Sequence, residues 1–276
     1  MDFPSSSIHL LSDHAILLIS LSNVSVAAGI HDFRTPGTGL YSNLKNYNLP
    51  YPEAVFDVGF FRSKPQPFVT LASELWPGLK HSPTITHSFL KLLSNKGLLL
   101  RNYSQNIDGL EDLAGIPEEE LVECHGHFCS SSCIKCHEQA DPDQVKNTIV
   151  KEGSVPKCEN CRGNVQPDIV FFGESLPERF YYRLLKTDVA KADLLLIMGT
   201  SLQVAPVSLI PNMVNCSRVL FNREKVLKIR KKKDIFLEGN CNENVTDLCA
   251  TLGWKEELLE HYAGCRLSSE PKQITR

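Results

Sequence analysis

The sequence predicts an α/β protein built around a doubly wound parallel sheet, and three observations lead to this fold class. Short apolar runs recur along the chain, segments with helical periodicity lie between them, and polar clusters follow the runs where strands would end. Continuous apolar runs are typical of strands that are buried on both faces of a parallel sheet. Strands that alternate with helices indicate βαβ units, which bind ligands in a crevice at the carboxyl ends of the strands.

The strands are predicted from five apolar runs. Four of them are assigned to the parallel sheet and span residues 15–20, 97–103, 192–199 and 219–222, and residues 168–172 are a fifth candidate. Because helical segments connect these runs, the sheet is expected to be Rossmann-like.

The helical segments have recognisable ends. Ser82 is predicted as the N-cap of the first helix, Pro83 suits its first turn, and Gly97 ends it. We place His87 on the polar side of this helix and expect it to be structural. Two further helices follow near the C-terminus, the first of which ends at Gly253. The three apolar faces consist of Ile85, Phe89, Leu92 and Leu93, of Val245, Leu248, Cys249 and Leu252, and of Trp254, Leu258 and Tyr262.

The composition is that of an ordinary globular protein. Of 276 residues, 42% are hydrophobic and 22% are charged, and the net charge is 29 − 32 = −3. At roughly 150 residues per domain, this length suggests one large domain or two smaller ones. The small net charge does not require nucleic acid as a partner. The longest apolar runs are far shorter than the ~20 residues of a spanning helix, which excludes an integral membrane protein.

The ten cysteines are expected to be reduced or bound to metal. No basic region precedes the modest apolar stretch at residues 16–21, so we expect no secretory signal and a cytoplasmic or nuclear location, with mitochondria left open.

Two cysteine pairs indicate a zinc site. Cys133 and Cys136 form one CxxC pair, Cys158 and Cys161 form another, and residues 137–157 separate them. Four thiolates in this arrangement match the tetrahedral geometry of structural zinc, which leaves no open position for a substrate. Two chance pairs or a redox motif are the alternatives, and Cys129 could compete as a ligand. We expect one zinc ion that holds an insertion together without taking part in chemistry.

Two stretches interrupt the alternation of strands and helices. Residues 35–79 are rich in proline, glycine and aromatic residues and are predicted as a loop with a helical insertion, and residues 126–166 form the zinc-binding insertion. The remaining segments, 15–34, 80–125 and 167–262, are expected to form one discontinuous Rossmann-like domain, with residues 1–14 and 266–276 as tails.

Four polar clusters lie where the predicted sheet places strand ends, and the second of them follows the short apolar pair Leu121–Val122. They are Gln105–Asn106–Ile107–Asp108, Cys124–His125–Gly126, Gly199–Thr200–Ser201 and Asn222–Arg223–Glu224. Each cluster alone is compatible with ordinary turn or cap residues, but together they are expected to open onto one crevice. Backbone N–H groups and hydroxyls of the third cluster can hold a phosphate, and Glu224 can accept hydrogen bonds from a ribose.

The motifs taken together resemble the sirtuins, a family of NAD-dependent protein lysine deacylases, and are most similar to the animal class I deacetylases of the cytosolic and mitochondrial types. The resemblance extends from about residue 27 to residue 254. It rests on Asp32–Phe33–Arg34, residues 103–108, Glu123–Cys124–His125–Gly126, the paired CxxC motifs, residues 167–174 and residues 198–202, in that order.

The resemblance implies a role for each matching residue. His125 matches a general base that acts on a ribose hydroxyl after nicotinamide has left, and an imidazole suits that task because its pKa is near neutral. Asn106 is implied in catalysis and, with Asp108, in the nicotinamide pocket. The implied cofactor contacts are Asp32, Phe33, Arg34, Gln105, Asn106, Ile107, Asp108, Gly199, Thr200, Ser201, Asn222, Arg223, Glu224 and Cys241. The implied contacts with the acyl-lysine peptide, by edge addition, are Val170, Phe171, Phe172, Gly173 and Glu174.

One segment departs from the family. Its phosphate-binding turn carries two glycines, but Leu21–Ser22–Asn23 stands at this place here. A non-glycine residue in a left-handed conformation costs about 1–2 kcal/mol, and its Cβ can collide with a phosphate. We therefore predict that NAD binding is weakened roughly tenfold or more.

Two functions of different classes remain open from the sequence. The first is an NAD-dependent protein lysine deacetylase that acts on acetylated proteins, uses NAD, carries one zinc ion and is impaired by the altered turn. The second is a catalytically weak or inactive relative that binds acylated peptides or protein partners. We expect no direct binding of nucleic acid, and the sequence leaves the oligomeric state open.

Overall fold

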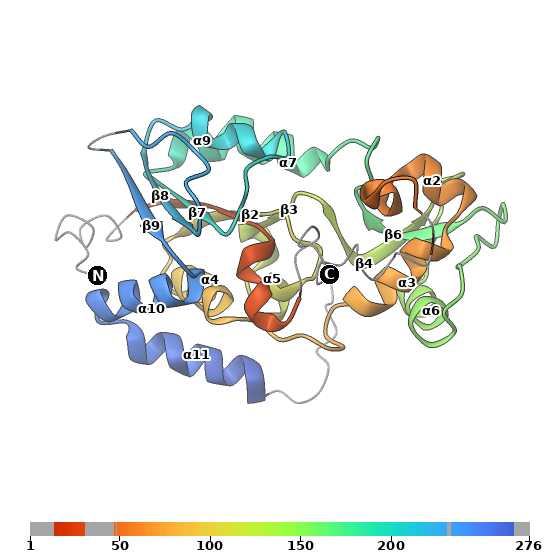
Figure 1. Cartoon of the computed structure of the whole chain (residues 1–276), viewed down its shortest axis with the longest axis horizontal. Helices are drawn as coiled ribbons and strands as arrows, with labels where there is room; N and C mark the ends of the chain where they lie inside the picture. Colours follow the sequence, from red (N-terminus) through yellow and green to blue (C-terminus); the bar gives the residue numbers. More distant parts are fainter. Residues whose placement is uncertain (1–13, 31–46, 48, 231–232, 268–276) are drawn as a thin grey trace.

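The computed structural model describes residues 14–30, 47, 49–230 and 233–267 (Figure 1). Its main element is a six-stranded sheet with the order β3-β2-β1-β7-β8-β9, in which every neighbouring pair is parallel. The strands are β1 (Ile16–Ser20), β2 (Leu99–Ser104), β3 (Leu121–Glu123), β7 (Leu194–Met198), β8 (Ser217–Asn222) and β9 (Asp234–Glu238). This sheet confirms the predicted α/β, Rossmann-like fold class.

Helices cover both faces of this sheet because its central strands are apolar on both sides. In β1, Ile16 and Leu18 contribute to one hydrophobic core, and Leu17 and Ile19 contribute to the other. The first core includes α4 (Ile85–Asn95), α10 (Cys241–Leu252) and α11 (Lys255–Leu267). The second includes α7 (Glu178–Arg183), the π-helical η7 (Leu184–Asp188) and α9 (Ile210–Met213). Figure 1 shows the two groups of helices on opposite sides of the strands.

Short helical turns connect these elements. They are η1 (Ser22–Val24), η2 (Val26–Ala28), α5 (Leu110–Leu113), η5 (Glu118–Glu120), α8 (Val189–Lys191) and η8 (Val207–Leu209). Among the described residues, no helix has both the length and the apolar character needed to cross a bilayer.

A second lobe combines the two insertions. It contains an antiparallel sheet of the order β5-β4-β6 and several helices. Its elements are β4 (Gly126–Cys133), β5 (Gln139–Ala140), β6 (Val165–Ile169), η4 (Pro52–Phe56), α2 (Val58–Ser63), α3 (Gln66–Leu75), α6 (Pro142–Lys146) and η6 (Asn147–Lys151). The rings of Phe61, Phe68 and Phe171 lie 4.9–5.4 Å apart between centroids and join the helical insertion to the residues after β6. The helical and zinc-binding insertions thus share one hydrophobic core, which the sequence did not indicate.

One predicted strand is assigned to the wrong sheet. Residues 168–172 were expected in the parallel sheet, but β6 ends at Ile169 and pairs antiparallel with β4. Val165 lies opposite Cys133 and Gln166 opposite Ser132. The reason is local, because β6 follows the second cysteine pair directly and returns along the strand that leads into the first pair.

The start of α4 also differs from the prediction. The N-cap is Thr84 and not Ser82, and the helix begins at Ile85. The Thr84 side chain accepts a hydrogen bond from the backbone of His87, and the Thr84 N–H donates to Nδ1 of His87 at 3.2 Å. This capping box turns the imidazole inward. His87 is therefore fully buried and does not lie on a polar face.

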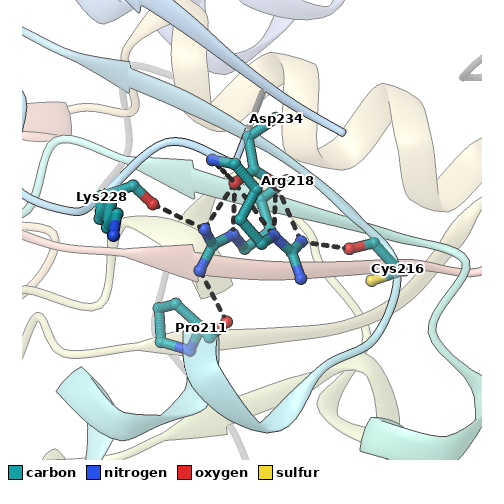
Figure 2. A network of polar contacts seen from close by, with 6 residues as sticks. Pro211, Cys216, Arg218, Lys228 and Asp234 are labelled. Atoms are coloured by element: carbon teal, nitrogen blue, oxygen red, sulfur yellow. Dashed lines mark hydrogen bonds and ion pairs between the residues drawn. The ribbon is translucent and has the colours of Figure 1, made fainter. Parts of the chain in front are cut away.

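The connection between β8 and β9 is held by a buried network of charges (Figure 2). Asp234, at the start of β9, accepts hydrogen bonds from Arg218 of β8 and from Arg230. Arg218 also donates to the carbonyls of Pro211 and Lys228, each at 2.9 Å. A parallel connection is usually covered by a helix, but the described part of this one has none. The ion network fixes it instead.

Candidate functional site

The polar clusters predicted from the sequence lie at one edge of the parallel sheet. Ser20 pairs with Ser104 of β2 and with Met198 of β7, and the next strand pairs with β7 in the same direction. Because all these strands are parallel, the residues that follow them leave the sheet on the same side. The N–H of Cys124 donates to the carbonyl of Ser104 at 2.8 Å, which brings the neighbouring His125 to this edge as well.

His125 is held in a defined orientation. Its Nδ1 lies 2.8 Å from the carbonyl oxygen of Gln105. A carbonyl can only accept, so Nδ1 carries the proton and Nε2 keeps its lone pair. Burial lowers the pKa of His125, and the hydrogen bond to the Gln105 carbonyl opposes this only in part. A neutral imidazole with a free Nε2 is suited to act as a general base.

Asn106 is fixed through two serines. Its backbone N–H donates to the hydroxyl of Ser104, and its side-chain amide donates to the hydroxyl of Ser25, both at 3.2 Å. Asp108 follows two residues later and accepts a hydrogen bond from the N–H of Leu110 at 3.1 Å. Both Asn106 and Asp108 are buried.

The pKa of Asp108 is raised to about 7. Burial is the main cause, and the charge of Glu111 adds to it. Hydrogen bonds from Ser25 and from the Leu110 backbone act in the opposite direction. The carboxyl of Asp108 therefore changes its protonation near neutral pH.

The third cluster begins at a glycine that the neighbouring turn requires. Gly199 has a φ of +62°, and a Cβ added there would lie 2.9 Å from the Cβ of Asn23 and 2.9 Å from the backbone nitrogen of Val24. The N–H of Asn23 donates to the Gly199 carbonyl at 3.2 Å. A side chain at position 199 would thus push the turn after β1 away from the sheet. Thr200 is buried, whereas Ser201 is exposed.

The altered turn after β1 does not have the backbone strain that we predicted. Leu21 and Asn23 are not among the non-glycine residues with positive φ in the described part of the chain, which are His137, Arg162 and Leu202. Residues 22–24 instead form the 3₁₀ turn η1. The expected cost of 1–2 kcal/mol for a left-handed residue was therefore wrong, because the chain passes this place in an ordinary turn. The collision of a side chain with a phosphate stays a prediction.

The fourth cluster is held by Asn222. Its side-chain amide donates to the carbonyls of Thr200 at 3.1 Å and Glu224 at 2.9 Å. Cys241 begins α10 beside it, and its Sγ lies 3.5 Å from the carbonyl of Phe221. Arg223 and Glu224 are exposed at the same edge. The start of α10 adds the positive end of a helix dipole to this edge.

One further observation indicates that a dinucleotide fits at this edge of the sheet. Nε2 of Gln105 and Oδ1 of Asn222 are buried, and neither has a hydrogen-bond partner in the described structure. Buried polar atoms are almost always paired. A ligand with phosphate and ribose groups along this edge would pair both atoms, because Gln105 at the end of β2 offers a donor and Asn222 at the end of β8 offers an acceptor.

The segment after β6 forms a turn and not a strand. The N–H of Phe172 donates to the carbonyl of Phe56 at 2.7 Å, and the N–H of Val58 donates to the carbonyl of Phe172 at 3.4 Å. The N–H of Phe171 donates to the carboxylate of Glu174 at 2.8 Å. A peptide cannot add along the whole of residues 170–174 in this conformation, because these groups are already used. The side chain of Phe172 is 50% exposed.

Other predicted residues are placed as follows. Ile107 is partly buried against the core of the second lobe. Asp32, Phe33 and Arg34 lie outside the described residues.

The four cysteines of the paired motifs form one cluster. Their sulfur atoms all lie within 4.8 Å of one another, and three of the pairs are 3.4–3.6 Å apart. Zinc–sulfur bonds of about 2.3 Å in a tetrahedron place sulfurs ~3.8 Å apart, so the cluster fits zinc. No disulfide joins them, and Cys129 is not part of the cluster.

The backbone around the cysteines passes very close to their sulfur atoms. The residue after each pair, His137 and Arg162, has a φ of 59°, so the two pairs form turns of the same shape. A Cβ at Gly163 would lie 2.9 Å from the sulfur of Cys133 and 3.3 Å from that of Cys161. Only glycine allows the backbone to pass this closely.

Sequence reasoning missed a buried polar cluster beneath Asn106 and Asp108. Glu111 accepts hydrogen bonds from Ser104 at 2.6 Å and from Ser20 at 3.2 Å. The only signal in the sequence was a serine at the last position of two apolar strands, where a buried polar side chain needs a partner.

Comparisons with known proteins identify a family that this chain matches. A model of the Sir2 family matches residues 22–206. Similar relatives are NAD-dependent protein deacetylase hst2 of Schizosaccharomyces pombe, 49% identical over 86% of this chain and 71% of the relative, and NAD-dependent protein deacetylase sirtuin-2 of Danio rerio, 46% identical over 87% of this chain and 68% of the relative. NAD-dependent protein deacetylase sirtuin-3 of Mus musculus is 47% identical over 87% of this chain and 72% of its own length.

Proposed function

Because the chain belongs to the Sir2 family, we propose that it is an NAD-dependent protein deacetylase that removes acetyl groups from lysines of protein substrates. The observation that carries this proposal is the placement of a neutral, oriented imidazole at the same sheet edge as the polar ends of β2, β7 and β8. The relatives, which match most of this chain, are named as deacetylases. They favour the catalytic function over an inactive relative.

His125 is the proposed general base. Its Nδ1–H is held by the Gln105 carbonyl, so Nε2 is the atom that receives a proton. Because burial keeps the ring neutral at pH 7, the base needs no prior deprotonation. Asn106 is proposed to orient the reacting part of the cofactor, and its own orientation is fixed by Ser25 and Ser104.

NAD, when bound, supplies the ribose carbon that accepts the acetyl oxygen and the nicotinamide that leaves. The proposed contacts at the described edge run from Gln105 and Asp108 at the end of β2, through Gly199, Thr200 and Ser201, to the end of β8 and the start of α10. The last group consists of Asn222, Arg223, Glu224 and Cys241, and Ile107 and residues 32–34 complete the proposed set.

The cysteine cluster is proposed to hold one structural zinc ion. Four sulfur ligands would fill all four positions of a tetrahedral zinc ion, so no position is left for a substrate. We propose the division of the chain that the sequence suggested, with residues 126–166 as the zinc-binding insertion. None of the ten cysteines forms a disulfide, which suits a reducing compartment, and we propose the cytoplasm or the nucleus.

Acetylated proteins are the proposed substrates. The exposed Phe172 and the turn at Gly173 lie next to the strand that follows His125, since the N–H of Val170 donates to the His125 carbonyl at 2.8 Å. We propose that residues 170–174 contact the substrate peptide through this turn and the exposed ring.

The test is the release of nicotinamide from NAD with and without an acetylated peptide. A deacetylase releases nicotinamide only when the peptide is present and yields free lysine in equal amount. A chain that binds the acetylated peptide in calorimetry but releases no nicotinamide would instead be the non-catalytic binder, and the proposal would be wrong.

A further inference from the structure

The connection between β8 and β9, residues 223–233, is a strongly basic segment of an acidic protein. It contains seven lysines and arginines and one glutamate, which gives it a charge of 7 − 1 = +6. Because the whole chain has a net charge of −3, the rest of it carries −3 − 6 = −9. The net charge, from which no binding of nucleic acid was expected, therefore conceals a segregation of charge. A polyanion would be attracted to this connection and repelled by the average surface elsewhere.

The two arginines of the network in Figure 2 hold the connection in place and are not available to a partner. Arg218 is buried, and both Arg218 and Arg230 bind the carboxylate of Asp234. The backbone N–H of Arg230 also donates to this carboxylate at 2.7 Å, and its guanidinium group donates to the carbonyl of Cys216 at 2.6 Å. Since one carboxylate faces two guanidinium groups, the network keeps one positive charge and adds to the attraction of an anion.

Three lysines of the connection are exposed, and the backbone that carries them is fixed. They are Lys225, Lys228 and Lys233. The carbonyl of Lys228 accepts a hydrogen bond from Arg218 at 2.9 Å, and the N–H of Lys233 donates to the carbonyl of Arg230 at 3.1 Å. Binding of an anion by these ammonium groups would therefore order side chains without having to order the main chain, which limits its entropic cost.

The apolar residues of the connection point to a partner in solution and not to a membrane. Val226, Leu227 and Ile229 are partly buried and pack against the core that contains Ile197 and Leu220. Firm binding of a basic segment to a bilayer requires an apolar or lipid anchor in addition to its charge. Because these apolar side chains are used in the core, the exposed part of the connection offers an anionic partner its lysines alone.

The side chains also indicate how a nucleic acid would be contacted. Single strands bind mainly by stacking of bases on aromatic rings, but residues 223–233 include no aromatic residue. Phe236 of β9 is partly buried, and Nζ of Lys225 lies 5.7 Å from the centroid of its ring. A lysine ammonium group acts on a phosphate as a point charge and does not match the edge of a particular base. Contact with a phosphate backbone, without sequence preference, is what remains.

We propose that Lys225, Lys228 and Lys233 form a surface that binds the phosphate backbone of double-stranded nucleic acid. A duplex suits this surface because its phosphates are closely spaced and hold condensed counterions, which are released when lysines take their place. Residues 231 and 232 lie outside the described residues, and the proposal does not depend on them. It does not rest on deacetylation either, because the lysines bind without any cofactor or acetylated peptide.

The experiment measures the fluorescence anisotropy of a labelled DNA duplex of about 20 base pairs as the full-length protein is added at several KCl concentrations. We expect a Kd on the order of 10 µM at about 50 mM KCl. The slope of log K against log salt should be about −2.7 or steeper, because each of three lysines that neutralises a phosphate contributes about −0.9. Replacing Lys225, Lys228 and Lys233 by alanine should weaken binding at least about tenfold and flatten the slope by about 0.9 for each lysine removed.

The matched control replaces Lys64, Lys151 and Lys255, three exposed lysines outside the connection, by alanine. It has the same net charge as the first triple variant and should bind the duplex as the unaltered protein does. The thermal midpoints of the two variants should agree, because the hydrogen bonds of the connection come from the backbone of the lysines and not from their side chains.

Several results would overturn the proposal. Equal losses in the two triple variants would show that binding follows the overall charge and not this surface. A salt slope shallower than about −1 in the unaltered protein, or no binding of the duplex at about 50 mM KCl, would exclude the phosphate contacts. Tighter binding to a single strand of the same length would indicate base stacking. Tighter binding to vesicles that contain phosphatidylserine than to the duplex would assign the surface to a membrane.

Discussion

The hydrogen bond from His125 to the Gln105 carbonyl decides which ring nitrogen can act in the proposed reaction. It assigns the proton to Nδ1 and leaves Nε2 as the base. Gln105 is itself fixed, because its N–H donates to the Ser20 carbonyl at 3.0 Å across to β1. The orientation of one imidazole thus depends on the pairing of two central strands, which makes it insensitive to surface changes.

His125→Ala is expected to abolish deacetylation, because no other group replaces the base at this place. Zinc content and the thermal midpoint should stay near those of the unaltered protein, since the ring makes a single hydrogen bond. His261→Ala on α11, outside the site, is the matched control. Peptide turnover near the original rate in His125→Ala would reject the assignment.

The pH profile follows from the same ring. A base must be unprotonated, so the rate should fall as the pH drops through the pKa of His125. Burial lowers that pKa, so the falling limb of kcat/KM for the peptide should lie below the ordinary histidine value of about 6.5. A limb above that value would show that another group titrates.

Asn23→Gly tests the altered turn. Because Asn23 has no positive φ, glycine relieves no strain there and instead increases the freedom of the unfolded chain. We expect a loss of about 0.5–1 kcal/mol in stability. Because the predicted collision with a phosphate is removed, we also expect a gain of tenfold or more in NAD affinity by calorimetry, equal to about 1.4 kcal/mol. An affinity within about threefold of the original would show that the Asn23 side chain does not collide with the cofactor.

At the scale of elements, the two cysteine pairs stabilise more than the zinc-binding insertion. Cys133 and Cys158 belong to the hydrophobic core that also contains Phe61 and Phe68 of the helical insertion. The Asn164 side chain further donates to the carbonyl of Phe61 at 3.3 Å. The folded state of α2 and α3 is therefore coupled to metal binding by the cysteine cluster.

Cys158→Ser is expected to release zinc and to unfold both insertions, because metal binding supplies much of the folding free energy of such sites. The zinc content should fall from one ion per chain to none, and limited proteolysis should cut the segments around α2 and α6. Cys129→Ser is the matched control, since Cys129 lies nearby but outside the cluster, and it should keep its zinc. Retained metal in Cys158→Ser would contradict the tetrathiolate site.

Element prediction succeeded where burial leaves a continuous apolar pattern. The runs at 15–20 and 192–199 contain β1 and β7, and the run at 97–103 covers all of β2 except Ser104, because both faces of these strands are covered. β9 was missed because it is an edge strand whose side chains are only partly buried. The capping residue of α4 was missed because the choice between Ser82 and Thr84 depends on His87, whose inward orientation is a tertiary effect.

The common edge of the polar clusters could be predicted from the sequence, whereas the buried cluster beneath it could not. Polar clusters after buried strands are visible in the sequence, so the edge that gathers Gln105, Asn222 and their neighbours could be predicted. Glu111 could not, because a glutamate at the start of a short helix is usually exposed and its partners come from β1 and β2. The ordinary backbone at Asn23 also depends on how the turn packs on Gly199, which no local pattern reveals.

At the scale of the whole molecule, the network around Asp234 connects stability to the proposed cofactor edge. The connection that it holds begins with Arg223 and Glu224 after the end of β8, and it includes Lys228, whose carbonyl accepts a hydrogen bond from Arg218 (Figure 2). Burial alone would raise the pKa of Asp234, but hydrogen bonds from Arg218 and Arg230 outweigh it and hold the pKa below its ordinary value. The unfolded chain therefore binds a proton at a higher pH than the folded protein does.

Asp234→Asn removes this charge and is expected to lower the free energy of unfolding by about 3 kcal/mol at pH 7, because two arginines lose their buried partner. The stabilisation by Asp234 is complete above the unfolded pKa and is lost as the pH falls toward the folded pKa. The difference between the two proteins in urea unfolding should thus be constant from pH 7 to about pH 5 and shrink below about pH 4. Asp247→Asn, an exposed carboxyl on α10, should differ little from the original at any pH. Because the freed connection carries Arg223 and Glu224, KM for NAD should rise in Asp234→Asn while kcat changes little. A difference in stability that persists unchanged to pH 2 would show that the ion network does not stabilise the fold through its charge.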